Sequence, residues 1–351
     1  MITPETTIKE IRSILQDNLF SQLIYDLSER GAGRFSDENR TLKDIQVADP
    51  AWNADDMVFG LNTLCRNAAR GRVLYDVYRS DETAACPGKA NVKLVHFPAE
   101  TACNYEKDCV RRTLILASGG AYGAVCNLPE AFPAAAEAAA LGIDCLCLTY
   151  RVGALAPLFP KPMEDLAAAI RFLFSNEQNL DVSMKHYAVG GFSAGGHLAA
   201  CGGIKELGYR KFNLPAPEAV LLAYPLLNVW KALEQLPEPY RKLMLKGLLG
   251  SGVDESYCGP YNVNQNIDCD YPPCFIVHAR DDETVDCELS SAFARALTTA
   301  DVPCVIEKPE HGGHGFGRGG KTEAEGWIKR AITFWKEQRQ RHETVSFTRK
   351  S

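Results

Sequence analysis

Gly190-Gly191-Phe192-Ser193-Ala194-Gly195-Gly196-His197 is the most informative stretch of this sequence. The apolar residues 187–189 before it are typical of a short strand, and residues 198–201 after it predict a helix. A Gly-x-Ser-x-Gly sequence between a strand and a helix predicts a nucleophile elbow, a tight turn that holds its serine in strained backbone. Gly191 and Gly195 fit this interpretation, because the packed turn leaves no room for larger side chains at these two positions. The Ser193 hydroxyl would project at the N-terminus of a helix, where backbone N–H groups can receive negative charge.

The same stretch, taken alone, is also compatible with an ordinary glycine-rich connection between a strand and a helix. The two interpretations differ in the context they require, since an elbow must stand within alternating strands and helices. The rest of the sequence therefore has to supply that context.

Composition indicates an ordinary globular protein. The chain has 351 residues, of which 46% are hydrophobic and 23% are charged, and its net charge is -6. With no run rich in lysine or arginine, we expect no nucleic-acid partner and no anionic membrane surface. The 13 cysteines are odd in number and irregularly spaced. We therefore expect reduced thiols in a cytoplasmic protein, with no disulfide framework and no metal site.

Residues 1–72 precede the main pattern and form a predicted helical N-terminal extension. Apolar residues at helical spacing predict one helix from Ile8 to Leu27, ended by Gly31-Ala32-Gly33, and a second over 55–69. We expect these apolar stripes to pack on the main domain or on a second copy of the chain. Association of identical chains through this extension is left open.

Strands and helices alternate over residues 73–342, which we assign to one α/β domain. Strands are expected at 73–78, 92–97, 113–117, 145–149, 187–189, 220–223, 274–279 and 304–307. Helices are expected between the later strands, at 130–141, 163–174 and 289–297, and after the last strand at 323–335. This alternation predicts a mostly parallel, doubly wound sheet with helices on both faces and a site at the carboxyl ends of the strands. Residues 343–351 are a predicted polar tail.

One insertion interrupts the alternation. About fifty residues separate the strands that end at 223 and begin at 274, and an insertion of this length in a compact domain is usually functional. Within it, residues 229–249 predict a helix. We expect residues 227–262 to form a small helical cap over the site, although a surface excursion packed on the domain is the alternative.

A serine nucleophile needs a histidine base held by a carboxylate, in the chain order Ser, acid, His for an elbow-type enzyme. His314 lies in a glycine-rich loop after the last strand, which suits a ring that must reach Ser193, and His311 is the competitor. Asp281 and Asp282 both follow the strand at 274–279. Either carboxylate could equally serve a turn or cap a helix.

Two backbone N–H donors must stabilise the oxyanion that forms after attack. We expect one at Ala194, directly after the nucleophile. The other should come from the loop after residue 117, which reads Ser118-Gly119-Gly120-Ala121-Tyr122-Gly123. We assign Gly120 and Ala121 as donors. If the cap closes over the elbow, Tyr122 and Trp230 are expected to contact substrate.

These motifs together resemble the α/β-hydrolase superfamily. Those that carry the resemblance are Gly119-Gly120-Ala121-Tyr122, Tyr150-Arg151, residues 191–197, Asp281-Asp282 and residues 312–316. More narrowly, they are similar to bacterial acetylesterases and acetylxylan esterases of the hormone-sensitive-lipase-like and feruloyl-esterase-like branch, over residues 73–340. In that family valine stands three residues after the catalytic aspartate, so Val285 selects Asp282. Ser118 and Ala121 depart from the usual oxyanion motif without removing backbone donors, which bears on pocket shape.

The resemblance implies a serine carboxylesterase of short, acetyl-like esters of a sugar or other small alcohol, with Ser193, His314 and Asp282 as its triad and no cofactor. A serine peptidase of the same fold is the nearest alternative. A ligand-binding pseudoenzyme is a further one, although such proteins tend to lose a triad residue. An assembly module built on residues 1–72 is the third.

Overall fold

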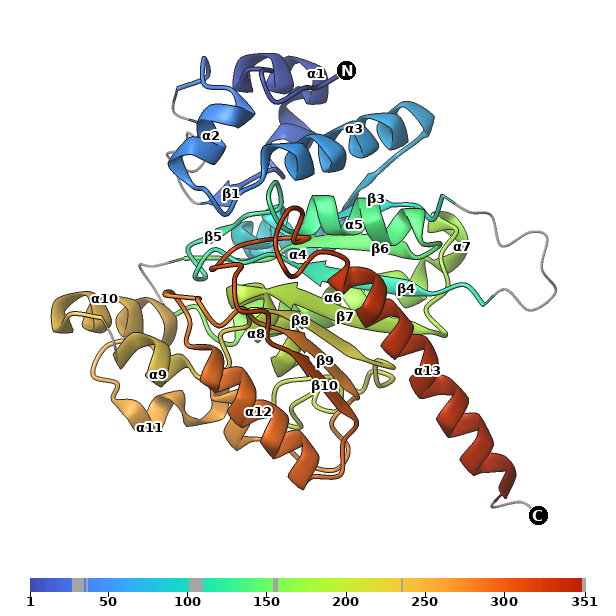
Figure 1. Ribbon diagram of the computed structural model, residues 1–351, viewed down its shortest axis with the longest axis vertical. Coiled ribbons are helices and arrows are strands. Elements are labelled where there is room, and N and C mark those ends of the chain that lie inside the picture. The colour runs from blue at the N-terminus through green and yellow to red at the C-terminus, as the bar shows by residue number, and fades with distance from the viewer. Residues whose placement is uncertain (27–34, 36, 101–109, 154–156, 235, 349–351) are drawn as a thin grey trace.

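A computed structural model describes residues 1–26, 35, 37–100, 110–153, 157–234 and 236–348 of the chain. A twisted sheet of eight strands runs through its centre (Figure 1). Its strands are β2 (Leu74–Asp76), β3 (Lys93–Phe97), β4 (Thr113–Ala117), β6 (Asp144–Thr149), β7 (Tyr187–Phe192), β8 (Val220–Ala223), β9 (Cys274–Val277) and β10 (Cys304–Glu307). A separate two-stranded pair joins β1 (Tyr25–Asp26) to β5 (Ala124–Val125).

Strand order in the large sheet is β10-β9-β8-β7-β4-β6-β3-β2. Neighbours from β6 to β10 are parallel, whereas β3 pairs antiparallel with both β6 and β2. The predicted mostly parallel sheet is therefore confirmed. The strands β4, β7, β8 and β9 are parallel and lie near one another in this sheet. The loops that follow them therefore gather at the same edge of the sheet, around the loop after β7.

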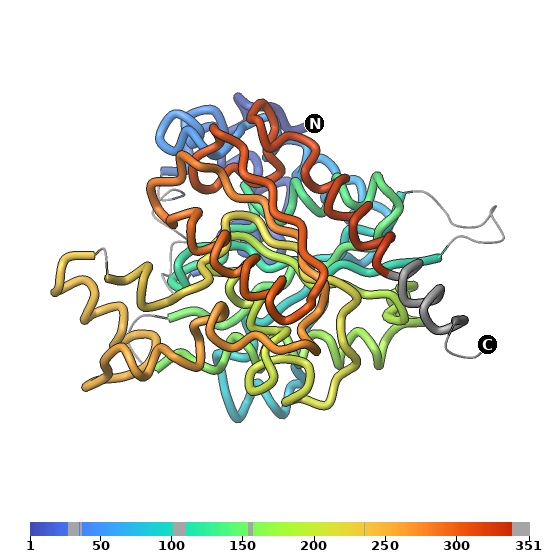
Figure 2. The backbone as a smooth tube through the Cα atoms, turned by 60° about the horizontal axis from the view of Figure 1, so that its bottom comes forward, coloured from blue at the N-terminus to red at the C-terminus, as the bar shows by residue number. Residues whose placement is uncertain are grey.

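Helices cover both faces of the sheet (Figure 2). Those of the main domain are α4 (Ser80–Ala85), α5 (Ala131–Ala140), α6 (Lys161–Ser175), α7 (Glu177–Leu180), α8 (Ser193–Cys201), α12 (Cys287–Thr299) and α13 (Trp327–Thr348). The inserted segment carries α9 (Val229–Glu234), α10 (Glu238–Leu249) and α11 (Glu255–Cys258). Residues of α5 and α13 belong to one hydrophobic core, and residues of α6, α8 and α12 belong to the other.

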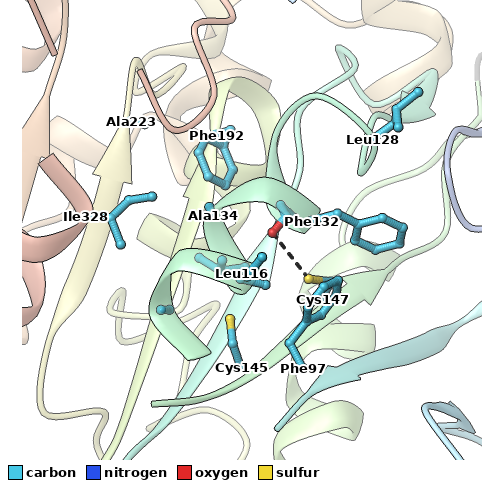
Figure 3. Packing of buried hydrophobic residues seen from close by; sticks show 14 of the residues in the cluster. Phe97, Leu116, Leu128, Phe132, Ala134, Cys145, Cys147, Phe192, Ala223 and Ile328 are labelled. Carbon is cyan, nitrogen blue, oxygen red and sulfur yellow. Dashed lines mark hydrogen bonds between the residues drawn. The ribbon is translucent and has the colours of Figure 1, made fainter. Parts of the chain in front are cut away.

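The central strands are apolar on both sides because each face of the sheet is covered. In β6, Cys145 and Cys147 face the core under α5, whereas Leu146 and Leu148 face the opposite core. Figure 3 shows the first of these cores, where the Cys147 thiol lies 3.6 Å from the carbonyl oxygen of Ala131. The cysteines of β6 thus act as small core residues, and every cysteine within the described residues is a free thiol.

The N-terminal segment forms α1 (Ile8–Phe20), α2 (Leu42–Ala48) and α3 (Ala54–Arg70), which lie together at the top of Figure 1. Met57, Leu61 and Leu64 of α3 are fully buried, as their helical spacing predicted. The helix packs on α5 so closely that a Cβ at Gly60 would lie 2.8 Å from the backbone nitrogen of Pro133. The apolar stripe of α3 is therefore covered by the chain's own main domain.

Three predicted helices have different bounds in the structure. The first ends at Phe20, where the chain turns, and Leu27 and residues 31–33 lie outside the described residues. The helix expected over 229–249 is two helices, because Pro237 disfavours helical backbone in the residue before it. The last helix begins only at Trp327, after Gly326 with φ +78°, and continues to Thr348 through the start of the predicted polar tail.

Two further local expectations change. The connection between β2 and β3, for which no helix was predicted, contains α4 and a short 3-10 helix at Pro87–Asn91. No pattern in the sequence predicted α2. Among the described residues, no helix combines the length and the apolar character needed to cross a lipid bilayer.

Candidate active site

Ser193 stands at the sharp turn between β7 and α8. Its φ of +50° lies in the left-handed region that a non-glycine residue rarely adopts. A Cβ at Gly191 would lie 2.3 Å from the carbonyl oxygen of Gly195, and one at Gly195 would lie 2.1 Å from that of Ala117. Both positions therefore require glycine, as the elbow pattern predicts, and the turn presents the Ser193 side chain at the strand ends.

A chain of hydrogen bonds joins Ser193 to a histidine and an aspartate. The Ser193 Oγ lies 3.0 Å from His314 Nε2, and His314 Nδ1 lies 2.7 Å from Asp282 Oδ2. Burial alone would raise the pKa of Asp282, but hydrogen bonds from two histidines and the backbone outweigh it and hold that pKa well below its usual value. Because Asp282 is ionised, His314 donates through Nδ1, which leaves Nε2 to accept the Ser193 proton.

Further donors fix the Asp282 carboxylate. Its Oδ1 accepts hydrogen bonds from the backbone N–H groups of Thr284 and Val285, both at 2.8 Å. Buried His278 donates through Nε2 to Oδ2 at 3.0 Å, and its Nδ1 lies 2.8 Å from Ser290 Oγ. The sequence analysis assigned no role to His278 and missed this supporting position.

The structure also distinguishes between the two candidate aspartates, Asp281 and Asp282, and between the two candidate histidines, His311 and His314. Asp281 accepts hydrogen bonds from the N–H groups of Gly312 and Gly313, at 3.0 and 2.7 Å. His311 is exposed and lies 3.4 Å from Asp281. Asp282 and His314 therefore form the chain to Ser193, whereas Asp281, after β9, contacts the backbone and the exposed His311 of the loop after β10.

The loop after β4, residues 118–123, is called the oxyanion loop here after the role predicted for it. Gly120, Ala121 and Tyr122 have successive positive φ values of 130°, 52° and 59°. Gly120 and Ala121 line the same pocket as Ser193, and Ala194 is the second residue of α8, where helix N–H groups have no partner within the helix. Within the described part of the chain, the N–H groups of Gly120, Ala121 and Ala194 donate to no other protein atom.

Two buried side chains hold this loop from opposite sides. At one end, the N–H of Gly119 donates to Glu130 Oε2 at 2.5 Å. At the other, the Tyr122 hydroxyl lies 2.5 Å from His197 Nδ1, while His197 Nε2 lies 2.7 Å from the carbonyl oxygen of Tyr261. Burial lowers the pKa of His197 to about 4, so this neutral ring donates to Tyr261 and accepts from Tyr122.

Glu130 is a carboxylic acid inside the site that the sequence analysis missed, because position 130 was assigned only to a helix start. Burial raises its pKa to about 7, although the Gly119 N–H favours the ionised form. Its Oε1 accepts from the Tyr224 hydroxyl at 3.1 Å, and that hydroxyl accepts from the N–H of Gly317 at 3.1 Å. Glu130 thus connects the oxyanion loop with the loop that carries His314.

Ser193 and His314 face a pocket of about 390 Å³. Its described lining consists of Asp49, Pro50, Ala51, Trp52, Gly120, Ala121, Cys126, Glu130, Ser193, Thr284, His314 and Gly315. The first four come from the N-terminal segment, and none comes from the described part of the inserted segment.

This lining corrects the two predicted substrate contacts. Tyr122 is buried, with its ring against Tyr150, Phe159 and His197, so it supports the oxyanion loop from behind. Trp230 packs against the core beneath α9 and is not part of the pocket wall. The cap was expected to supply the wall, and the structure places the connection between α2 and α3 there instead.

Comparison with known proteins is consistent with this architecture. The model of the BD-FAE family matches residues 104–297. The chain is 26% identical over 233 residues to endo-1,4-beta-xylanase B of Butyrivibrio fibrisolvens, an alignment that covers 64% of this chain and 35% of that protein. The chain thus spans about a third of that relative's length.

Solved structures share the fold. An acetyl ester-xyloside bifunctional hydrolase from Caldicellulosiruptor lactoaceticus aligns with a TM-score of 0.58 at 24% identity, over 78% of this chain and 96% of that one. A thermophilic esterase from Thermogutta terrifontis, with propionate bound, aligns with a TM-score of 0.56 at 23% identity, over 75% and 93%.

The α/β-hydrolase fold that the resemblance implied is confirmed by these similarities. With a family model that matches more than half of its length, the chain has the α/β-hydrolase fold and belongs to the BD-FAE family.

Proposed function

We propose that this protein is a serine carboxylic ester hydrolase that removes short acyl groups, acetyl above all, from a sugar or another small alcohol. The observation that carries the proposal is the hydrogen-bonded chain from Ser193 through His314 to Asp282, set beside free backbone N–H groups at the edge of a pocket. Such a constellation is recognised by its geometry and suits acyl transfer.

In the first half of the reaction His314 Nε2 takes the Ser193 proton while Oγ attacks the ester carbonyl carbon. Negative charge then develops on the carbonyl oxygen, within reach of the N–H groups of Gly120, Ala121 and Ala194. The imidazolium of His314 is stabilised by ionised Asp282. As the tetrahedral intermediate collapses, His314 gives its proton to the leaving alcohol oxygen, and the acyl group remains on Ser193.

In the second half a water molecule takes the place of the alcohol. His314 accepts one of its protons as the water oxygen attacks the acyl carbon, and the same N–H groups stabilise the second oxyanion. Collapse returns the proton to Ser193 and releases a carboxylic acid. Every proton is moved by His314, and Asp282 stays ionised throughout.

The class of substrate is proposed from the relatives and from the pocket. Endo-1,4-beta-xylanase B and the acetyl ester-xyloside hydrolase carry names that refer to xylan or xyloside chemistry. In this chain the buried residues Cys126 and Glu130 line the pocket, and we expect them to limit the depth open to an acyl chain. Each methylene beyond this limit should meet a wall, and discrimination by one methylene is worth about 1–3 kcal/mol in a fitted pocket.

Hydrolysis of p-nitrophenyl esters of increasing chain length, acetylated sugars and aminoacyl anilides, measured side by side, tests the proposal. We expect kcat/KM to be highest from acetate to butyrate and to fall steeply by octanoate. Ser193→Ala should retain the fold and lower kcat by roughly 10⁴-fold. A maximum at octanoate would refute the short-chain assignment, a preference for anilides would favour a peptidase, and full activity of Ser193→Ala would remove the serine mechanism.

A cytoplasmic location and self-association are two further proposals. Free thiols throughout the described cysteines are compatible with the cytoplasmic location predicted from the sequence. Self-association through the N-terminal segment also stays a prediction, and light scattering of the purified protein would measure it.

A further inference from the structure

We propose that Asp49–Trp52, the connection between α2 and α3, forms the wall that receives the leaving alcohol of the ester and selects uncharged, hydroxyl-bearing alcohols. The inference rests on the proposed esterase function and assigns a specificity role to residues that precede the family match at 104–297. All four residues line the pocket that contains Ser193 and His314.

The position of this connection relative to His314 identifies the alcohol side. A Cβ at Gly315 would lie 3.7 Å from Trp52 Nε1 and 3.8 Å from Ala51 Cβ, so the wall adjoins the residue after His314. His314 must give its proton to the leaving oxygen, which therefore departs along the histidine side of the pocket. An alcohol group larger than methyl has to extend against Ala51 and Trp52.

The wall is held to the histidine loop by charged and polar contacts. Asp56, in the first turn of α3, accepts from Arg318 Nη1 at 3.0 Å and from the N–H of Gly320 at 3.1 Å. Asn53 donates to the carbonyl oxygen of Gly320 at 3.3 Å, and Lys321 pairs with Asp55. Because α3 and the loop after β10 are joined in this way, the wall and His314 keep a fixed relation, as specificity requires.

Polar groups of the lining indicate the kind of alcohol. Asp49, Glu130 and Thr284 line a pocket that has no lysine or arginine among its described lining residues. Such a lining disfavours an anionic alcohol, because like charges repel in a partly desolvated site. Pro50, Ala51 and Trp52 add apolar surface of the kind against which a neutral sugar ring can pack.

The substitution Ala51→Trp in the full-length protein tests the wall, because the larger side chain would fill the space proposed for the alcohol. Acetate esters of ethanol, a neutral methyl xyloside and a methyl glucuronoside vary the alcohol, and p-nitrophenyl acetate and butyrate vary the acyl group. Relative to ethyl acetate, kcat/KM for the xyloside acetate should fall about tenfold or more, in line with steric discrimination in fitted pockets. The butyrate-to-acetate ratio should stay within twofold of its native value.

Two further variants keep the test decisive. Pro50→Trp adds the same side chain at an exposed neighbouring position, which serves if Ala51→Trp fails to fold. Leu243→Trp adds an indole to the exposed face of α10 and should alter neither series. The native protein should also prefer the xyloside acetate to the anionic glucuronoside acetate, and Asp49→Asn should narrow that preference.

The outcomes separate this inference from the proposed function. If the native protein hydrolyses the esters but both pocket tryptophans leave the alcohol series unchanged, the wall is wrong and the esterase stands. A changed butyrate-to-acetate ratio with an unchanged alcohol series would place the connection on the acyl side and overturn the proposal. Absence of hydrolysis of every ester by the native protein would remove the esterase function, and the alcohol site with it.

Discussion

The N-terminal segment and the inserted segment each hold one of the two loops around Ser193, by different chemistry. Ion pairs join the N-terminal segment to the loop of His314. Asp56 pairs with Arg318, and Asp55 pairs with Lys321. The inserted segment holds the oxyanion loop through neutral groups, since the Tyr261 carbonyl binds His197 and His197 binds Tyr122. Figure 1 shows the two segments on different sides of the sheet, with α1–α3 at the top and α9–α11 at the lower left.

The segments also differ in what they bury. In the N-terminal segment the apolar faces of α1 and α3 are covered, and the connection between α2 and α3 reaches the pocket. In the inserted segment, Tyr240 and Leu243 of α10 are 65% and 54% exposed, and no described residue lines the pocket. Position in the chain therefore does not identify the pocket wall: the insertion after β8 supports the site, and the segment before the domain shapes it.

The largest expected effect concerns Asp282, the residue of the core domain that positions His314. The loss of kcat in a variant of this residue is the reference for the substitutions in the two segments. Asp282→Asn should lower kcat by about 10⁴-fold, because an amide favours the wrong histidine tautomer. Asp281→Asn should lose less than tenfold, since the Asp281 carboxylate contacts the N–H groups of Gly312 and Gly313 and the exposed His311, and not the ring of His314. Steady-state kinetics of both variants, at matched thermal stability, decide the assignment, and the reverse ranking would overturn it.

Glu130 connects the two loops that the segments hold, and its ionisation should be visible in stability. Burial raises its folded pKa to about 7 from an ordinary value of 4.5. A raised carboxyl pKa gives stability that is complete below the unfolded pKa and is lost as pH rises through the folded pKa. Relative to Glu130→Gln, the native protein should therefore lose about 3 kcal/mol of unfolding free energy between pH 4.5 and pH 8.

Urea denaturation of both proteins at several pH values measures this difference. Because both proteins share all other titrating groups, subtraction isolates Glu130. A difference that stays constant with pH, or that favours the native protein at high pH, would contradict the buried position of this carboxyl group.

Matched aspartate substitutions compare the two segments directly. Asp56→Ala should cost about 2 kcal/mol of stability, because it leaves Arg318 and the Gly320 N–H with fewer partners, and should lower kcat/KM about tenfold by loosening the His314 loop. Asp254 caps α11 by accepting from the N–H of Ser256. Asp254→Ala should destabilise the protein less than Asp56→Ala, because it removes only an exposed helix cap, and should leave kcat/KM unchanged. Equal kinetic effects of the two substitutions would erase the distinction between the segments.

Local patterns explain why much of the fold could be predicted. Gly191 is required by its contact with Gly195 and Gly195 by its contact with the end of β4, and the spacing of the two glycines around Ser193 predicted the turn. The apolar strands were visible because both faces of the sheet are covered. The chain order Ser, acid, His indicated Ser193 and His314 and left Asp281 and Asp282 open, and the family resemblance selected Asp282. The structure brings Ser193, His314 and Asp282 within hydrogen-bonding distance in series.

Features that depend on where distant segments meet could not be predicted in this way. The pocket wall at Asp49–Trp52 exists because α3 docks on the histidine loop about 260 residues later, through Asp56 and Gly320. Glu130 and His197 read as ordinary helix residues until their partners, Gly119 and Tyr122, are placed beside them. The cap was predicted to line the pocket because it follows a strand on the side of the active site. The position of an insertion in the chain, however, does not determine the direction in which the insertion folds.

The smallest expected effect tests whether the inserted segment ever reaches the substrate. Tyr240 stands exposed on α10, so Tyr240→Ala should change the unfolding free energy by no more than about 0.5 kcal/mol. If the segment stays on its own side of the sheet, KM for p-nitrophenyl acetate, butyrate and hexanoate should be the same in the variant and the native protein. If α10 instead closes over the pocket during turnover, its exposed aromatic face would contact the longer acyl chains, and KM for hexanoate should rise selectively. Such a rise, absent for acetate, would return the inserted segment to the role of a lid and limit the N-terminal wall to the alcohol side.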